Sequence, residues 1–328
     1  MFDYIYVSAM IGAIMVDRIY NVSKPDFDDN MPTRQKIDMV RLESVADGDT
    51  TYETRLLMPE EPVVDDVLMF AYGMGANSFF HEDEACAIAE LGYPVAIHDE
   101  PRRQKRMTVI DLAFGRRSLH SHMEHKLNPM IFASQAISGA MRSVEEVYNP
   151  AGGFTIKGHS KGGITAAMLG AYEPNVRAVV LDAPAGVLRR NALMNHMRDG
   201  RGMVMDEALP MARLIFDSRI PGSRERATSS IITDPGRLGR EILSLVGRTP
   251  DIRHELTRVK KRGGKVAVIA HEYDKFFDMN DMDADVPDLI QNGLVDLYAR
   301  IQGSKHINPG YDPQFSAYIY DLVRRRLN

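Results

Sequence analysis

Short apolar runs alternate with longer amphipathic segments along most of this chain. The apolar runs predict buried strands over residues 65–71, 94–98, 153–157, 176–181, 265–270 and 294–301. The amphipathic segments predict helices over residues 77–91, 130–147, 163–172 and 315–327. Strands that are apolar on both faces and alternate with helices favour a mainly parallel sheet with helices on both sides. The pattern therefore predicts the α/β class.

The amino-terminal part departs from this alternation. Residues 1–37 form a predicted arm, which is apolar and uncharged over residues 4–16 and polar over residues 17–36, where a loop is expected. The apolar stretch is shorter than the roughly 20 residues that a membrane span needs, and acidic Asp3 replaces the basic start of a secretory signal. We expect a docked helix or strand there, with a membrane-surface contact or a homodimer contact as open alternatives.

Two features organise the rest of the chain. Alternation over residues 39–44 and 51–56, on either side of a glycine-containing turn, predicts an antiparallel hairpin. Residues 183–264 separate two strands that are expected to be neighbours, and an insertion after the carboxyl end of a strand would lie over a site as a helical cap. The core then comprises residues 38–182 and 265–328.

Composition limits the classes of function. The chain has 328 residues, 44% of them hydrophobic, and a net charge of −5. These values suit one large globular domain with an insertion and argue against nucleic-acid binding, so the basic run at residues 101–106 is expected to be a solvated face. Cys86 is the only cysteine, which excludes an intrachain disulfide and favours a buried structural thiol and a cytoplasmic location.

The motif Gly-His-Ser-Lys-Gly at residues 158–162 carries the clearest chemistry. It lies between a predicted strand and a predicted helix, which is the context that makes a G-x-S-x-G match a nucleophile elbow. Ser160 would occupy a strained turn that exposes its hydroxyl. Gly158 and Gly162 would remove the Cβ atoms that clash in so tight a turn.

A serine hydroxyl needs a base, and the base needs an acid that orients it. Asp274, just beyond a predicted strand, is the acid candidate, and its rivals are Glu272, Asp278 and Asp182. His306, in the glycine-containing loop after the last strand, is the candidate base. Both would lie at the carboxyl edge of the sheet, where ligands bind in such folds.

Two backbone amides are expected to hold the oxyanion of the tetrahedral intermediate. Lys161, directly after the serine, supplies the first amide. Met74, within the Tyr-Gly-Met-Gly sequence at residues 72–75, is the candidate for the second, because its flanking glycines let the backbone approach a substrate closely.

Together these motifs resemble the α/β-hydrolase superfamily. The resemblance covers residues 38–328 and rests on the serine motif, the glycine-rich turn, Asp274 and the Gly-Ser-Lys-His sequence at residues 303–306. It implies an α/β-hydrolase fold, a mainly parallel central sheet flanked by helices with an inserted helical cap. Two positions depart from the family pattern, since Tyr72 replaces the His of His-Gly-x-Gly and His271 replaces the Gly of Gly-x-x-Asp.

The predicted activity is hydrolysis of a carboxylic ester or thioester through an acyl-enzyme on Ser160, with His306 as base and Asp274 as orienting acid. Acyl transfer, cleavage of a carbon–carbon or amide bond, and a catalytically idle binding module remain open. No cofactor or metal is implied, and the histidine cluster at residues 120–125 is expected in a polar loop or at a helix start. Arg and Lys outnumber Asp and Glu over residues 189–262, so a small anionic substrate would suit a basic cap.

Overall fold

A computed structural model describes residues 18–23, 33–46, 50–73, 78–99, 129–188, 251–306 and 312–327 of the chain. The strands within these residues are β1 (Ile19–Val22), β2 (Ile37–Ala46), β3 (Thr50–Pro59), β4 (Val67–Ala71), β5 (Val95–His98), β6 (Phe154–His159), β7 (Val176–Asp182), β8 (Lys265–His271) and β9 (Leu297–Ile301). The helices are η1 (Ser78–His81), a 3₁₀ turn, and α3 (Glu82–Glu90), α6 (Pro129–Val147), α7 (Gly162–Tyr172), α13 (Arg253–Lys261), α14 (Met279–Gln291) and α16 (Pro313–Leu327).

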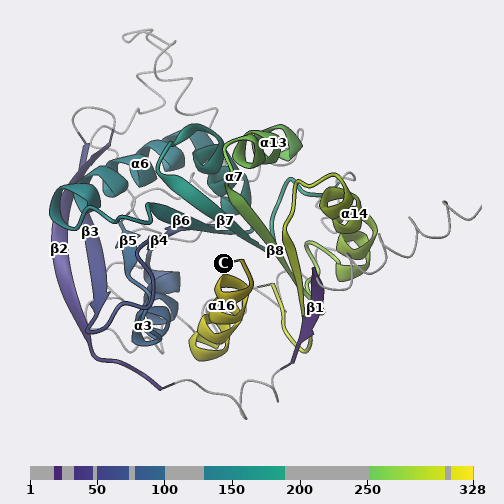
Figure 1. The fold of residues 1–328 in the computed structure, drawn as a ribbon, viewed down its shortest axis with the longest axis horizontal. Coiled ribbons are helices and arrows are strands. Elements are labelled where there is room, and N and C mark those ends of the chain that lie inside the picture. Colours follow the sequence, from purple (N-terminus) through teal and green to yellow (C-terminus); the bar gives the residue numbers. More distant parts are fainter. Residues whose placement is uncertain are drawn as a thin grey trace, which may run out of the picture.

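The described strands form one mixed sheet in the order β1-β9-β8-β7-β6-β4-β5-β3-β2 (Figure 1). Strand β3 pairs antiparallel with β2 and with β5, and the other pairings are parallel. Strands β4, β5 and β6 are buried along their whole length, as expected for parallel strands that helices cover on both faces. The predicted fold class and the predicted hairpin, here β2 and β3, are confirmed.

Two layers of helices cover the sheet (Figure 1). Apolar residues of α6, α7, α13 and α14 join one buried cluster with Ile156 and Val179 of the sheet. Apolar residues of α3 and α16 join a second cluster with Phe70 and Val180. Val179 and Val180 are adjacent in β7 and belong to opposite clusters because side chains alternate across a strand. The carboxyl ends of the parallel strands therefore meet at one edge of a sheet that is closed on both faces.

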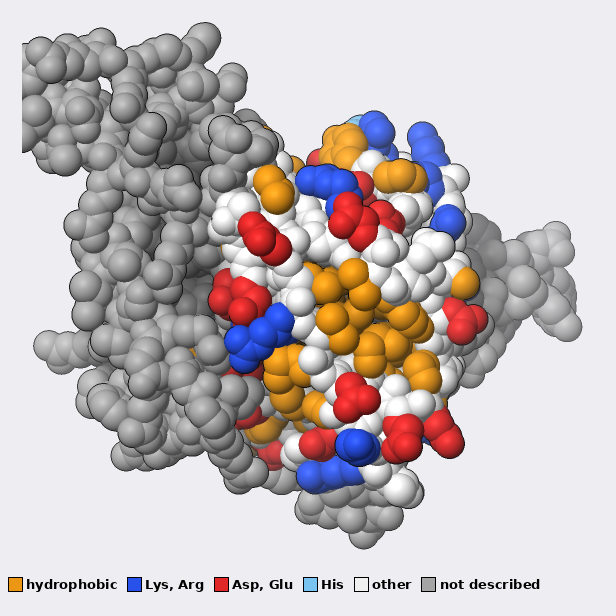
Figure 2. All heavy atoms as spheres, turned by 90° about the vertical axis from the view of Figure 1, so that its left-hand side faces the viewer, with side chains coloured by type: hydrophobic (Ala, Val, Ile, Leu, Met, Phe, Trp, Pro, Cys, Tyr) orange, Lys and Arg blue, Asp and Glu red, His pale blue; other side chains and the backbone are white. Residues whose placement is uncertain are grey.

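Helix α6 also closes part of the outer edge of β2. Ser143 Oγ donates a hydrogen bond to Glu43 O at 3.1 Å. Gly139 makes this approach feasible, since a Cβ atom at that position would overlap Val45 O. An uncovered edge strand invites pairing with another chain, and a helix across it removes that opportunity. Apolar side chains also gather on this side of the molecule (Figure 2), and those of β2 that are exposed are Met39, Val40 and Val45.

Three elements differ from the sequence predictions. The polar segment at residues 17–36 is predicted to be a loop or arm, but β1 forms within it and pairs in parallel with β9 at the far edge of the sheet. Helix α14 was not predicted, because Pro287 interrupts its pattern. Helix α13 falls inside the predicted cap at residues 183–264, yet its Leu256 and Val259 pack into the core. The greater part of the cap, residues 189–250, lies outside the described residues, so the cap stays a prediction.

Candidate active site

The serine motif forms a sharp turn between strand β6 and helix α7. Ser160 has a φ of 55°, in the left-handed region that residues with a side chain rarely adopt. A Cβ atom on Gly158 would overlap Gly162 O, and one on Gly162 would overlap Ala71 O. The strand, turn and helix predicted for residues 153–172 are therefore confirmed. Backbone strain held at one serine is characteristic of functional positions.

Backbone hydrogen bonds hold this turn against the end of β7. Ser160 N donates to Asp182 O at 3.0 Å, and Ser160 O accepts from Ala185 N at 2.9 Å and from Gly163 N at 2.9 Å. Lys161, the N-cap of α7, is buried. The amino-terminal end of a helix carries a partial positive charge and points amide donors outward. The turn thus places the serine hydroxyl at an end of the helix that favours negative charge.

The glycine-rich turn after β4 touches the serine turn. A Cβ atom on Gly73 would lie 3.1 Å from His159 Nδ1 and 3.4 Å from Ser160 Cβ, so only a glycine leaves room here without a shift. The hydroxyl of Tyr72, one residue earlier, donates to His98 O at 2.8 Å and accepts from His98 N at 3.2 Å. Met74, the second predicted oxyanion donor, lies outside the described residues.

Asp274 and His306 form a buried pair, as the sequence analysis expected of an acid and a base. Asp274 Oδ2 lies 2.8 Å from His306 Nδ1, and both side chains are almost fully buried. Asp274 Oδ1 accepts hydrogen bonds from Phe276 N at 2.7 Å and from Phe277 N at 2.9 Å. Burial alone would raise the pKa of Asp274, but the adjacent His306 and these donors hold it below its ordinary value. The carboxylate is therefore ionised near neutral pH and accepts from His306 Nδ1.

His159, the residue before the serine, joins this pair to the serine turn. Its Nε2 atom lies 2.7 Å from His306 O, and the two imidazole rings are 4.8 Å apart. Burial, followed by the nearby His306, lowers the pKa of His159 to about 3. The ring is thus neutral near pH 7, and its single proton is on Nε2, because a carbonyl oxygen can only accept. Sequence analysis did not single out this contact, since the second residue of the motif is variable.

The three rival acids have other partners. Asp182 forms an ion pair with Lys157 at 2.9 Å and bonds His271 at 2.6 Å. Glu272 accepts from the backbone amide of Gly303 at 2.7 Å. Asp278 caps helix α14 by accepting from Asn280 N at 2.7 Å. Asp274 is thus the candidate acid that contacts His306, and the contacts of each rival are structural.

A buried charged network, which sequence analysis missed, lies behind the site. Lys157 Nζ contacts Glu84 and Asp182, and all three side chains are at most 3% exposed. Burial disfavours all three charged forms, but the attraction between the opposite charges outweighs this effect. The pKa of Glu84 therefore falls to about 2, and that of Asp182 lies well below its ordinary value. Ser316 of α16 also bonds Glu84. A lysine inside an otherwise apolar strand was the sequence feature that could have revealed this network.

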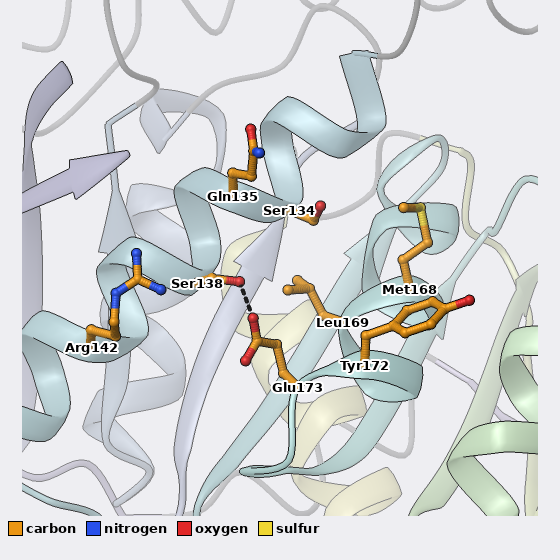
Figure 3. Close-up of a pocket in the computed structure, with 8 residues that line it drawn as sticks. All are labelled: Ser134, Gln135, Ser138, Arg142, Met168, Leu169, Tyr172 and Glu173. Atoms are coloured by element: carbon orange, nitrogen blue, oxygen red, sulfur yellow. Dashed lines mark hydrogen bonds between the residues drawn. The ribbon is translucent and has the colours of Figure 1, made fainter. Parts of the chain in front are cut away.

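A cavity of about 410 Å³ lies elsewhere, between helices α6 and α7 (Figure 3). Its lining includes Gln135, Arg142, Met168 and Tyr172 but none of the candidate site residues. Glu173 accepts a hydrogen bond from Ser138 in its wall at 2.5 Å. This cavity therefore does not belong to the candidate active site.

Metal sites and membrane spans are absent from the part of the chain that the structure describes. No cluster of His, Cys, Asp or Glu there has the arrangement of a metal site, and the histidines at residues 120–125 lie outside that part. None of the described helices combines the length and apolar character of a membrane span. Cys86 is only partly buried, which differs from the expectation of a buried thiol. Even so, burial raises its pKa to about 11, so the thiol is poorly reactive.

Comparison with known proteins identifies the fold. No protein-family model and no curated protein matches the sequence. A bacterial membrane phospholipase A described as a virulence factor is 15% identical, with a TM-score of 0.57 over 99% of this chain and 93% of that one. An esterase of Pyrococcus furiosus is 9% identical, with a TM-score of 0.53 over 89% and 92% of the two chains. A thermophilic esterase of Thermogutta terrifontis is 12% identical, with a TM-score of 0.53 over 89% and 100%. The chain has the α/β-hydrolase fold.

Proposed function

We propose that this protein is a serine hydrolase that cleaves a carboxylic ester or thioester. The observation that carries the proposal is the buried hydrogen bond of 2.8 Å between Asp274 and His306, on a loop that His159 ties to the strained Ser160 turn. A nucleophile in a strand-to-helix turn, a histidine and an orienting acid are the parts that acyl transfer through a serine requires. The hydrolase names of the structural neighbours agree with this proposal at the level of fold.

The proposed reaction has two halves. Ser160 Oγ attacks the carbonyl carbon while His306 Nε2 takes the hydroxyl proton, and the imidazolium then gives that proton to the departing alcohol or thiol. Water attacks the acyl-enzyme in the second half, His306 accepts its proton, and the carboxylic acid leaves as Ser160 recovers its hydrogen. Asp274 holds Nδ1–H throughout, which orients the ring and stabilises its cation.

Stabilisation of the oxyanion is assigned to backbone donors. The amide of Lys161 follows the serine at the positive end of α7, and the amide of Met74 would be the second donor. The contact of Gly73 with His159 and Ser160 supports this assignment, because it brings the glycine-rich turn against the nucleophile. No cofactor is part of the proposal.

The substrate is proposed to be a small acyl ester or thioester, and the basic composition of residues 189–262 favours an anionic one. We assign the predicted cap over the site to the segment between β7 and β8. Hydrolysis of a charged and a neutral p-nitrophenyl ester at low and high salt tests the preference. An apparent affinity for the charged ester that does not fall with salt contradicts electrostatic attraction.

Covalent labelling tests the proposed function directly. The protein is incubated with a fluorophosphonate, its intact mass is measured, and the labelled peptide is mapped. One adduct on Ser160, absent from the Ser160→Ala variant, is the expected result, together with a burst of p-nitrophenol from a short-chain ester. A folded protein that gives neither adduct nor burst contradicts the proposal and favours a catalytically idle fold that binds a partner. Product analysis with added alcohol or amine acceptors separates hydrolysis from acyl transfer.

A further inference from the structure

His271 connects three parallel strands at the carboxyl edge of the sheet. It is the last residue of β8, its Nε2 lies 2.6 Å from Asp182 Oδ1 at the end of β7, and its Nδ1 lies 2.5 Å from Ser304 Oγ after β9. All three residues are at most 2% exposed. A carboxylate oxygen only accepts, so Nε2 carries a proton, and in the neutral ring Nδ1 then accepts from the hydroxyl of Ser304. Both ring nitrogens are thus satisfied in the neutral ring.

These three residues have the composition of a second catalytic triad, but their surroundings exclude that role. Ser304 is 1% exposed, so no substrate can reach its hydroxyl. Asp182 forms an ion pair with Lys157 at 2.9 Å, which holds its carboxylate in the core. The chain Asp182–His271–Ser304 is therefore a rigid connection between buried groups.

The connection joins the two loops that carry the proposed acid and base. We name residues 271–278 the acid loop and residues 302–306 the base loop. His271 begins the acid loop three positions before Asp274, and Ser304 lies in the base loop two positions before His306.

Backbone bonds run between the same two loops. Tyr273 N donates to Ser304 O at 2.9 Å, and Glu272 N donates to Ile301 O at 2.9 Å. The side chain of Glu272 accepts from Gly303 N at 2.7 Å. These bonds set the spacing of the loops. The imidazole of His271 adds a side-chain link that continues to the core of the sheet through Asp182.

We propose that His271 is a positioning residue that, through Ser304, fixes the distance and angle between Asp274 and His306. This inference rests on the proposed function for its expected effect on kcat, but not for the expected effect on the geometry of the Asp274–His306 pair. A glycine at position 271, as in the Gly-x-x-Asp pattern, has no atoms to reach both a carboxylate and a hydroxyl. The departure from the family pattern thus supplies a link between acid and base loops that glycine cannot make.

Removal of one hydroxyl tests the proposal with little change of shape. In Ser304→Ala the imidazole of His271 loses its partner in the base loop. The matched control is Ser316→Ala, which removes another buried hydroxyl from the opposite end of the same network, where it bonds Glu84. Ser304→Ala loses the bond to His271, and Ser316→Ala loses the bond to Glu84 and a second one from Lys157 Nζ at 3.3 Å. The control therefore perturbs the buried network at least as much, but only Ser304 lies between the acid and base loops.

Two readouts follow the base loop. The first is the downfield proton resonance of His306 Nδ1–H, assigned by its absence from His306→Gln. It is expected to shift or broaden in Ser304→Ala and in His271→Ala, and to stay unchanged in Ser316→Ala. The second is ester hydrolysis, in which Ser304→Ala is expected to lower kcat about tenfold with KM within about twofold, as the loss of one positioning hydrogen bond implies. Ser304→Thr, which keeps the hydroxyl, should restore both.

Each outcome decides the matter. An unchanged His306 resonance in a folded Ser304→Ala variant overturns the proposal, and so does an equal loss of kcat in Ser304→Ala and Ser316→Ala. An inactive wild-type protein refutes the proposed function alone, because the resonance still reports whether Ser304 and His271 fix the pair.

Discussion

His306 Nδ1 lies 2.8 Å from Asp274 Oδ2, and the opposite oxygen of the same carboxylate is held by two backbone amides, those of Phe276 and Phe277. The carboxylate is therefore fixed in its plane before it meets the imidazole. Because Asp274 accepts at both oxygens, it selects the ring tautomer with the proton on Nδ1. In the neutral ring this leaves Nε2 of His306 unprotonated, which is the state that a general base requires.

Replacement of Asp274 by asparagine is the first prediction. The amide can donate where the carboxylate accepts, so the ring can adopt the wrong tautomer. We expect kcat for p-nitrophenyl acetate to fall by about 10⁴, the loss typical of this change in a serine triad. The control is Asp278→Asn, because asparagine also caps helices well and Asp278 is the N-cap of α14. Comparable losses in the two variants would contradict the assignment of Asp274.

Replacement of two glycines at the site by alanine is predicted to have different effects, a loss of activity for Gly73 and a loss of stability for Gly162. A Cβ atom on Gly73 would lie 3.1 Å from His159 Nδ1 and 3.4 Å from Ser160 Cβ, so Gly73→Ala should fold with its neighbours shifted by a few tenths of an ångström. Small errors of placement reduce catalysis strongly, and we expect kcat to fall on the order of tenfold. Steady-state kinetics and a thermal melt check this result, and a variant with full activity would contradict it.

Gly162→Ala provides the contrast. Its Cβ atom would overlap Ala71 O of strand β4, and this backbone atom cannot rotate away. The strand or the helix must move, so we expect a loss of roughly 3 kcal/mol or more in the free energy of unfolding. Urea denaturation measures the loss. A stable Gly162→Ala variant would show that the serine turn tolerates a wider geometry than these contacts imply.

The sequence predicted the elements whose pattern is set by burial. Strand β4 is apolar throughout, and β8 is apolar between Lys265 and His271 at its ends, because helices cover both faces of the sheet. This feature is visible without a structure. The serine turn could also be predicted, because the G-x-S-x-G motif lies between a predicted strand and a predicted helix. The positions of Asp274 and His306 after neighbouring parallel strands made them candidates, but Glu272, Asp278 and Asp182 stayed open as rival acids until the structure placed Asp274 beside His306.

Other features depend on contacts between distant residues and could not be predicted. Strand β1 has four residues in a polar segment and exists because β9 offers it an edge. Helix α14 tolerates Pro287 in its interior. The pairing of Lys157 with Glu84 joins residues 73 positions apart, so each looked like an isolated polar residue. The bond from His159 to His306 O likewise has no pattern in the sequence.

Removal of the Lys157 charge is expected to destabilise the fold strongly. Glu84 and Asp182 would then be buried carboxylates without their cation, and breaking such a pair typically costs about 3–5 kcal/mol. We therefore expect Lys157→Met to lose a comparable free energy of unfolding, measured by urea denaturation. Lys265→Met, at an exposed position in β8, should change it little. Adding Glu84→Gln to Lys157→Met should recover part of the loss, and no recovery would contradict the electrostatic explanation.

The last prediction concerns acid sensitivity and His98, whose ring stacks on Tyr72 at 4.8 Å. Burial lowers the pKa of His98 from its ordinary 6.5 to about 4, against the opposing effect of Asp99. The unfolded chain binds this proton below pH 6.5 and the folded chain only below about pH 4, so stability falls as the pH drops through this window. The shift corresponds to on the order of 3 kcal/mol lost by pH 4. His98→Phe keeps a stacked ring and removes the proton site, and should make the free energy of unfolding less dependent on pH between 6.5 and 4. The control is His254→Gln, at an exposed position in α13. Urea denaturation at several pH values gives the free energy of unfolding as a function of pH for each variant. If its slope matches that of the wild type in both variants, His98 does not have this role.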